Sequence, residues 1–327
     1  MGLPTDLVTF FDPMRQAGQD VPSTLQPHSL GDFFGVHNYD YRLMWEAASI
    51  CRRLVDAGVL TAAGTGKGSP PLSECYWANS VRPEKVTSPL FEFLAYGFPA
   101  IHQHFSPAVL AIILEKENGD ADIGTGFLLN NRMIATARHC IENMPSIIIK
   151  GWSPQVASIA AIYAYEDPKV DLAILSFSSD PLPGTPGFSV GTPSILDNVL
   201  TMGYPQIPGF DAPLIAETSQ IAAVIKSSIG VVVSLAQSYL DSQDYLLLSA
   251  RVKGGNSGGP VISRKGEVVG IVTHFPAEEH GRPDLLGYAA ALPSIVITDL
   301  LNEVAQESTL VAHFNFWGTD TGFRTKQ

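Results

Sequence analysis

The stretch Gly254-Gly255-Asn256-Ser257-Gly258-Gly259-Pro260 is the strongest local signal in the chain. Glycines surround its serine, and because glycine lacks a Cβ, the backbone can bend sharply there and aim N–H groups at one point. Converging N–H groups are what an oxyanion hole requires. A plain glycine-rich turn that contains a serine is the alternative interpretation. A catalytic interpretation therefore needs partner residues elsewhere in the sequence.

A histidine and an aspartate supply those partners. The segment Thr136-Ala137-Arg138-His139-Cys140 ends an apolar strand with a histidine, His139. The segment Val170-Asp171-Leu172-Ala173-Ile174-Leu175 places Asp171 at the start of another apolar strand. A serine hydroxyl becomes nucleophilic when an imidazole takes its proton, and a carboxylate fixes the tautomer of that imidazole. Taken singly, His139 also fits a core histidine and Asp171 a strand cap. Together with Ser257 they predict a catalytic triad.

Two other carboxylates compete with Asp171 for the third position of the triad. Glu166 and Asp167 are close to Asp171 in sequence, but both precede Pro168 in a polar segment. Such a segment is typical of a surface loop. We therefore expect Glu166 and Asp167 at the surface and assign the orienting carboxylate to Asp171.

Short apolar runs separated by glycine and proline turns fill the chain from Pro107 onward. This spacing is typical of a β-barrel or β-sandwich. The segment 293–306 instead has apolar residues at helical spacing and predicts a closing helix. The runs expected as strands are 108–115, 124–129, 133–136, 146–150, 157–163, 172–177, 199–203, 222–233, 245–249, 261–262 and 268–273.

The first hundred residues follow a different pattern. Apolar residues recur at helical spacing over 41–57, Gly58 stands where the helix would end, and 74–77 is typical of a short strand. This region resembles the end of a winged-helix domain. Its glycine-rich loop contains Gly66-Lys67, but Gly68 stands where a phosphate loop has Ser or Thr, and a helix precedes the loop. We therefore expect packing or protein contact here rather than phosphate binding.

Charge and apolar run length argue against nucleic acid and membrane partners. The 327 residues include 20 Lys and Arg against 32 Asp and Glu, a formal net charge of −12, whereas phosphate-rich surfaces need clustered positive charge. No apolar run approaches the roughly 20 residues that span a bilayer. The first residues lack the basic start and apolar centre of a signal peptide.

Cysteine content bears on the compartment. Cys51, Cys75 and Cys140 are an odd number of thiols in a long chain, which cannot form the dense disulfide framework of small secreted domains. With the absence of a signal peptide pattern, this predicts a cytoplasmic protein.

At the residues of the predicted triad the chain resembles the trypsin-like serine proteases of the chymotrypsin fold, and more closely the bacterial HtrA-like branch than the secreted digestive enzymes. Further matching stretches are Gly124-Thr125-Gly126-Phe127, Gly270-Ile271-Val272 and Gly287-Tyr288-Ala289-Ala290. The resemblance covers about residues 106–306. It implies a mainly β protein with two six-stranded antiparallel β-barrels and the active site between them.

Three segments are expected along the chain. Residues 1–105 are predicted to form a mostly helical, winged-helix-like domain, residues 106–306 the protease domain, and residues 307–327 a C-terminal tail. So few residues follow the closing helix that the PDZ domain of many HtrA relatives is not expected. The N-terminal domain is therefore the expected regulatory or partner-binding module.

The resemblance also assigns catalytic roles. Ser257 would be the nucleophile, His139 the general base and then acid, and Asp171 the carboxylate that orients the imidazole. The backbone N–H groups of Gly255 and Ser257 would form the oxyanion hole. No metal and no cofactor is implied.

A pocket for the residue that precedes the cut is implied as well. Its floor would lie six positions before the serine, at Arg251, with Thr273, His274 and Phe275 as one wall and Gly287 opposite. A guanidinium holds a carboxylate through two charge-assisted hydrogen bonds, so this floor favours acidic substrates. The alternative is that Arg251 turns outward and leaves a small apolar pocket.

Two positions depart from the secreted relatives. The cysteine that pairs with the one after the catalytic histidine is missing from 124–127, so Cys140 is expected to be a buried free thiol. Asn256 stands where zymogens have the aspartate that receives a new N-terminus, so activation by that cleavage is not expected.

Three functions remain in competition. The first is an intracellular serine endopeptidase that acts on protein or peptide substrates and is regulated through its N-terminal domain or a protein partner. The second is a catalytically silent scaffold of the same fold. The third is a recognition module whose protease activity is secondary. The intact triad favours the first over the second, and nothing in the sequence separates the first from the third.

Overall fold

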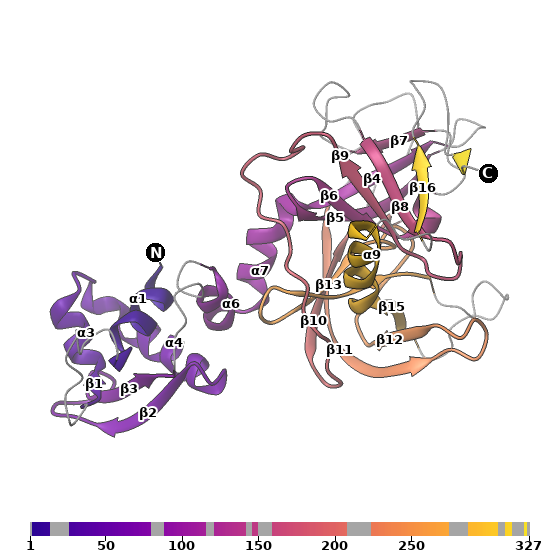
Figure 1. Cartoon of the computed structure of the whole chain (residues 1–327). Helices are drawn as coiled ribbons and strands as arrows, with labels where there is room; N and C mark the ends of the chain where they lie inside the picture. The colour runs from indigo at the N-terminus through magenta and orange to yellow at the C-terminus, as the bar shows by residue number, and fades with distance from the viewer. Residues whose placement is uncertain are drawn as a thin grey trace. The chain divides into compact units, whose positions relative to one another are not determined.

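The computed structural model describes residues 2–13, 26–79, 88–115, 121–141, 146–149, 159–207, 224–274, 287–306, 311–315 and 324–325. The chain divides into two compact units, Met1–Ile101 and His102–Gln327 (Figure 1). The division falls inside helix α7 (Phe98–Phe105), four residues before the boundary that we predicted.

The N-terminal unit combines helices with a three-stranded sheet. Its elements follow the order helix, strand, helix, helix, strand, strand, and the sheet order is β1-β3-β2. The winged-helix-like character of this unit stays a prediction. The elements are α1 (Leu3–Phe10), β1 (His28–Ser29), α3 (Leu30–Val36), η1 (Tyr41–Leu43), α4 (Met44–Asp56), β2 (Leu60–Thr65), β3 (Glu74–Ala78) and α6 (Leu90–Tyr96).

Helix α4 organises the core of this unit. Its buried residues Ala47, Ile50, Cys51 and Leu54 recur at helical spacing and form one apolar face. This face belongs to a cluster that includes the fully buried Phe33 of α3 and residues of α1 and α6. Burial also raises the pKa of the Cys51 thiol, which keeps it protonated and unreactive. The predicted helix over 41–57 is confirmed.

A closed antiparallel barrel forms the second half of the larger unit. Its strand order is β10-β11-β12-β15-β14-β13. Side chains such as those of Val199, Leu246 and Val269 fill its interior, and closure leaves no free sheet edge. The strands are β10 (Asn198–Gly203), β11 (Lys226–Gln237), β12 (Asp244–Leu248), β13 (Pro260–Ser263), β14 (Val268–Val272) and β15 (Ala289–Pro293).

The first half of the larger unit is an eight-stranded sheet in the order β17-β16-β8-β9-β6-β5-β4-β7. The mainly β prediction is confirmed. In the described residues, however, this half is an open sheet rather than a closed six-stranded barrel. Strand β16 pairs with the edge of β8, and β7 pairs with β4 at the other end of the sheet. The strands are β4 (Val109–Glu115), β5 (Ala121–Asn130), β6 (Met133–Thr136), β7 (Ser146–Ile149), β8 (Ile159–Tyr165), β9 (Ala173–Phe177), β16 (Val311–Asn315) and β17 (Arg324–Thr325).

The C-terminal segment differs from the prediction. We expected residues 307–327 to form a tail outside the protease domain, yet β16 pairs antiparallel with β8 and β17 with β16. The reason is that the edge of β8 exposes backbone donors and acceptors, which a further strand satisfies. The closing helix, predicted over 293–306, is α9 (Ile295–Ala305), and it contacts β8 and β16 (Figure 1).

Within the described ranges, no helix combines the length and apolar character that crossing a bilayer requires.

Candidate active site

Strand pairing brings His139 and Asp171 together. Strands β6 and β9 are antiparallel neighbours, with Thr136 opposite Ala173 at the end of the ladder. His139 lies just beyond this end of β6, in the short helix η3 (Arg138–Cys140), and Asp171 lies just before β9. Antiparallel pairing therefore places both side chains at the same end of two adjacent strands.

These two residues are in direct hydrogen-bond contact. His139 Nδ1 lies 2.7 Å from Asp171 Oδ2, and the backbone N–H of His139 donates to Oδ1 at 2.9 Å. The Thr273 hydroxyl also donates to Oδ2. Both carboxylate oxygens are thus held, and the imidazole is oriented through Nδ1.

Burial and hydrogen bonding act in opposite directions on the acidities of the pair. Burial by itself would lower the pKa of His139, but the contacts of its ring with Asp171 and Cys140 outweigh this and raise that pKa. Burial would raise the pKa of Asp171, but the hydrogen bonds from His139 and Thr273 outweigh it and lower that pKa. Asp171 is therefore a carboxylate that stabilises the imidazolium of His139.

The loop before β13 carries Ser257 between two glycines that the fold requires. Gly255 and Gly258 have φ of +94° and +81°, a region that side chains with a Cβ rarely adopt. A Cβ on Gly258 would stand 2.2 Å from the carbonyl oxygen of Thr125. The Ser257 carbonyl accepts from the Thr125 N–H at 2.9 Å, which ties this loop to β5.

Only some of the backbone N–H groups in this loop make hydrogen bonds within the described residues. The N–H of Asn256 donates to Lys253 O at 3.0 Å, and that of Gly258 donates to Val272 O at 2.7 Å. Among hydrogen bonds of the described residues, none uses the N–H of Gly255 or Ser257. The two predicted oxyanion-hole donors are therefore available to a ligand.

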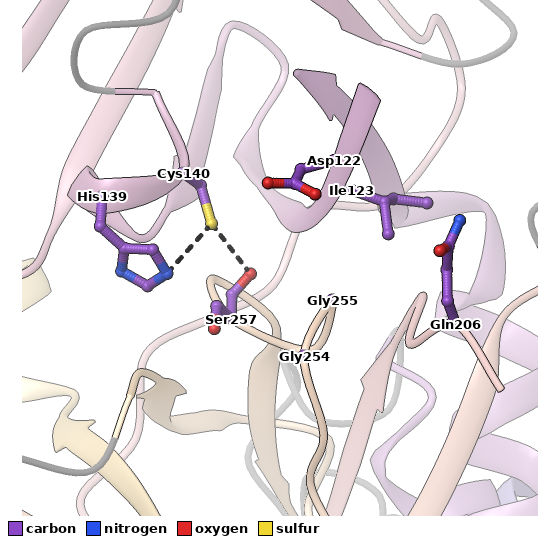
Figure 2. A pocket seen from close by; sticks show the side chains of 8 residues that line it. All are labelled: Asp122, Ile123, His139, Cys140, Gln206, Gly254, Gly255 and Ser257. Carbon is purple, nitrogen blue, oxygen red and sulfur yellow. Dashed lines mark hydrogen bonds between the residues drawn. The ribbon is translucent and has the colours of Figure 1, made fainter. Parts of the chain in front are cut away.

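Ser257 and His139 line one cavity of about 400 Å³ without a direct hydrogen bond between their side chains in the described set (Figure 2). Instead, Cys140 Sγ lies 3.6 Å from His139 Nε2 and 3.6 Å from the Ser257 carbonyl oxygen. Cys140 is buried and free, as predicted, but its contact with Nε2 was not predicted. The full lining is Asp122, Ile123, His139, Cys140, Gln206, Gly254, Gly255 and Ser257.

Asp122 and Gln206 are cavity residues that sequence reasoning missed. Asp122 lies two residues before the Gly124-Thr125-Gly126-Phe127 motif, and this proximity was the one available signal. Gln206 follows strand β10 and carries no motif of its own. Its place in the cavity depends on how β10 lies beside β5 in the folded unit.

Comparison with known families decides what this arrangement is. Residues 124–271 match the family described as trypsin-like peptidase domain, and the matched range contains His139, Asp171 and Ser257. Residues 124–271 form a trypsin-like peptidase domain. The peptidase domain thus spans both halves of the larger unit.

The chain is also similar to curated relatives and solved structures. A probable periplasmic serine endoprotease DegP-like of Chlamydia trachomatis is 25% identical over 198 residues, which are 60% of this chain and 36% of that protein. The serine endoprotease DegS of Salmonella typhimurium is 27% identical over 217 residues, 63% of this chain and 56% of that protein. The HtrA-type protease AlgW with tripeptide is similar at 19% identity and a TM-score of 0.47, with 63% of each chain covered. The chain thus spans about a third to just over half of the curated relatives' length.

The residues predicted to bind substrate are dispersed in the peptidase domain. Arg251 is exposed and lines a different cavity of about 290 Å³, together with Lys226 and Lys253. Its backbone N–H donates to Ser228 Oγ at 3.0 Å. Gly287 is exposed with φ of +72°, and Phe275 lies outside the described residues.

Thr273 and His274 lie against the pair formed by His139 and Asp171. Thr273 is buried and its hydroxyl donates to Asp171; its place in the wall of a substrate pocket stays a prediction. His274 Nδ1 lies 3.3 Å from His139 Nδ1 and 3.6 Å from Asp171 Oδ2. The rival carboxylates, Glu166 and Asp167, are exposed, as predicted.

Proposed function

We propose that this protein is a serine endopeptidase that hydrolyses peptide bonds through Ser257, His139 and Asp171. The observation that carries the proposal is the 2.7 Å contact of His139 Nδ1 with Asp171 Oδ2 beside a cavity that also holds Ser257. Peptidase-domain membership and the serine endoprotease relatives support it.

Each of these residues has its own role in the proposed reaction. His139 Nε2 takes the proton of Ser257 Oγ as the oxygen attacks the substrate carbonyl, and Asp171 stabilises the imidazolium that forms. The N–H groups of Gly255 and Ser257 donate to the oxyanion, each contributing about 3 kcal/mol to the stability of the transition state. His139 then protonates the leaving amine, and water releases the acyl group from Ser257 by the reverse sequence.

One rearrangement precedes this reaction. In the structure Nε2 contacts Cys140 Sγ rather than Ser257 Oγ, so the Ser257 side chain must rotate or the imidazole must shift toward it. Both are rotations about side-chain bonds, and substrate in the cavity would favour the geometry that reacts. The proposal therefore does not need a change in the fold.

Labelling by a fluorophosphonate probe tests the nucleophile. The full chain should be labelled at Ser257, and Ser257→Ala should lose labelling completely. His139→Ala should reduce both labelling and peptide hydrolysis by about a thousandfold or more. Labelling of Ser257→Ala at the rate of the unaltered chain would contradict the assignment.

A catalytically silent scaffold of the same fold is the alternative. Such a scaffold has no use for an oriented imidazole, nor for two N–H groups left free beside the serine. Unlabelled, correctly folded protein in the fluorophosphonate experiment would favour this alternative.

We also propose a preference for an acidic side chain before the cut. Arg251, Lys226 and Lys253 bring three positive side chains to one cavity that also borders Asn256, the neighbour of Ser257. Cleavage of a mixed peptide library should favour Asp or Glu, and Arg251→Ala should weaken this preference. Arg264→Ala, an exposed arginine in the β13–β14 turn, is the matched control. A preference for small aliphatic residues, unchanged by Arg251→Ala, would overturn the idea.

The N-terminal unit is proposed to regulate the peptidase or to bind a partner protein. Its own compact core supports an independent role. A truncated chain that lacks residues 1–101 should remain soluble and hydrolyse peptides at an altered rate. An insoluble product would contradict independence, and an unaltered rate would contradict regulation.

A reducing compartment, such as the cytoplasm, is proposed as the setting. All three cysteines are buried and free, which supports a protein that needs no oxidation to fold. Some relatives are described as periplasmic, so fractionation of the source cells is the direct test. Recovery with periplasmic markers would overturn this assignment.

A further inference from the structure

His274 has no role in the catalytic triad, yet it lies against it. Its Nδ1 is 3.3 Å from His139 Nδ1 and 3.6 Å from Asp171 Oδ2. The two imidazole planes are inclined at 69°, with ring centres 5.0 Å apart. Because the Nδ1 atoms are much closer together than the ring centres, both rings turn these nitrogens toward each other and toward Asp171.

These three atoms have the spacing of a metal site. Zinc holds nitrogen and oxygen ligands at about 2.0–2.1 Å in a tetrahedron, whose ligand atoms are then about 3.3–3.4 Å apart. The separations of 3.3 Å between the two Nδ1 atoms and 3.6 Å between His274 and Asp171 are close to that value. The 2.7 Å hydrogen bond between His139 and Asp171 must lengthen by about 0.6 Å, which loss of its proton would cause.

The ligand types select among divalent cations. Two imidazoles and one carboxylate suit zinc, whereas magnesium and calcium prefer oxygen ligands throughout. The described lining of the adjoining cavity also holds Arg138 and Lys169 against Asp171 and Asp241. These charges balance, so net negative charge does not attract a cation here. Affinity must come from the three ligand atoms themselves, and two nitrogens among them favour zinc.

The surroundings hold the ligands and leave room for a fourth. Asp171 Oδ1 accepts the backbone N–H of His139, and Thr273 donates to Oδ2, so the carboxylate is oriented by its neighbours as metal ligands commonly are. A cavity of about 250 Å³ is lined by His139, Asp171 and His274. A water molecule from this cavity can complete the tetrahedron.

We propose that His139 Nδ1, Asp171 Oδ2 and His274 Nδ1 form a zinc site that inhibits the peptidase reversibly. Zinc takes the lone pair of Nδ1, and the proton that Nδ1 carried moves through water to Nε2. With a proton on Nε2, His139 cannot accept the proton of Ser257. The inhibition rests on the proposed function, whereas the binding of zinc does not.

Binding is measured on the full-length Ser257→Ala chain, which cannot turn over substrate. Titration calorimetry with zinc chloride should show one site, and cobalt chloride should give the strong visible absorption of a tetrahedral cobalt centre. His274→Gln and His139→Gln, each in the Ser257→Ala background, should weaken zinc binding by about tenfold or more. Magnesium chloride should not bind.

Two matched variants locate the site. His28→Gln removes another histidine close to a carboxylate, 4.0 Å from Asp32, and should leave zinc affinity unchanged. Cys140→Ser should also leave it unchanged, because the thiol lies at Nε2 rather than Nδ1. Loss of zinc binding in Cys140→Ser, or undiminished binding in His274→Gln, would overturn the proposal, as would the absence of any binding.

Inhibition is measured separately with the serine present. Zinc should inhibit peptide hydrolysis, and chelation should restore it. The zinc concentration that halves the rate should be about tenfold or more higher for His274→Gln than for the unaltered chain, with each rate normalised to that protein's own zinc-free rate. If the unaltered chain hydrolyses no peptide while Ser257→Ala binds zinc through His274, the proposed function fails and the metal site stands. Zinc bound at this site without inhibition of an active chain would overturn the inhibitory role.

Discussion

Cys140 Sγ lies 3.6 Å from His139 Nε2, the ring nitrogen that a general base uses, whereas Asp171 binds Nδ1 of the same ring. The thiol therefore contacts the ring nitrogen that would take the proton of Ser257 in the proposed reaction. The two residues adjoin in sequence within η3, so this contact is built into the turn that delivers the histidine.

Replacing Cys140 by alanine should raise the activity of the peptidase. Removing a competing hydrogen bond worth about 1 kcal/mol corresponds to roughly a fivefold increase in kcat/KM. This increase is measured by the rates of hydrolysis of a peptide substrate at saturating and at limiting substrate concentrations. A hundredfold loss in the folded variant would show instead that the thiol takes part in the reaction.

Thr273 should act as a positioning residue through its hydrogen bond to Asp171. Thr273→Val keeps the shape but leaves the buried carboxylate short of a donor, at a cost of about 1–3 kcal/mol, which corresponds to a loss in kcat of about five- to 150-fold. Thr273→Ser keeps the hydroxyl and should restore most of kcat. Equal losses in both variants would indicate a packing role instead.

Two glycines beside Ser257 should respond very differently to alanine. Gly258 has φ of +81°, and a Cβ there would meet Thr125 O at 2.2 Å. Gly258→Ala should therefore lower the free energy of unfolding by about 3 kcal/mol or more. A Cβ on Gly254 would meet nothing within 4 Å, so Gly254→Ala should change stability by less than about 0.5 kcal/mol. Urea unfolding of both variants checks this, and equal losses would contradict the proposed geometry.

The N-terminal unit should lose stability when the cap of α3 is removed. Ser29 Oγ accepts from the Asp32 N–H at 3.1 Å, and Asp32 Oδ2 accepts from the Ser29 N–H at 2.8 Å. Ser29→Ala should cost about 1 kcal/mol in thermal unfolding of this unit.

Acid should remove part of the same stabilisation. Hydrogen bonding from the Ser29 backbone, against a smaller effect of burial, lowers the pKa of Asp32. A lowered pKa in the folded state means that the contribution is present above the usual Asp pKa of about 3.9 and is lost as pH falls through the folded value. Asp32→Asn should therefore show a weaker loss of stability on acidification than the unaltered chain, and an identical acid profile would contradict this.

Local sequence determined much of this protein. The triad residues lie in short motifs whose chemistry can be read one at a time, and the strand runs and helix α4 follow from side-chain periodicity within single segments. Periodicity reports which residues are buried within an element. It does not report which elements become neighbours.

Only the tertiary structure decided the contacts made across long sequence separations. Thr273 and His274 reach Asp171 because the end of β14, more than 100 residues later in the chain, meets the start of β9 at the cleft. Strand β16 joins β8 because a free edge accepts any segment that can reach it. Such pairings depend on the packing of the whole unit, since backbone hydrogen bonds between strands are the same for almost any side chain.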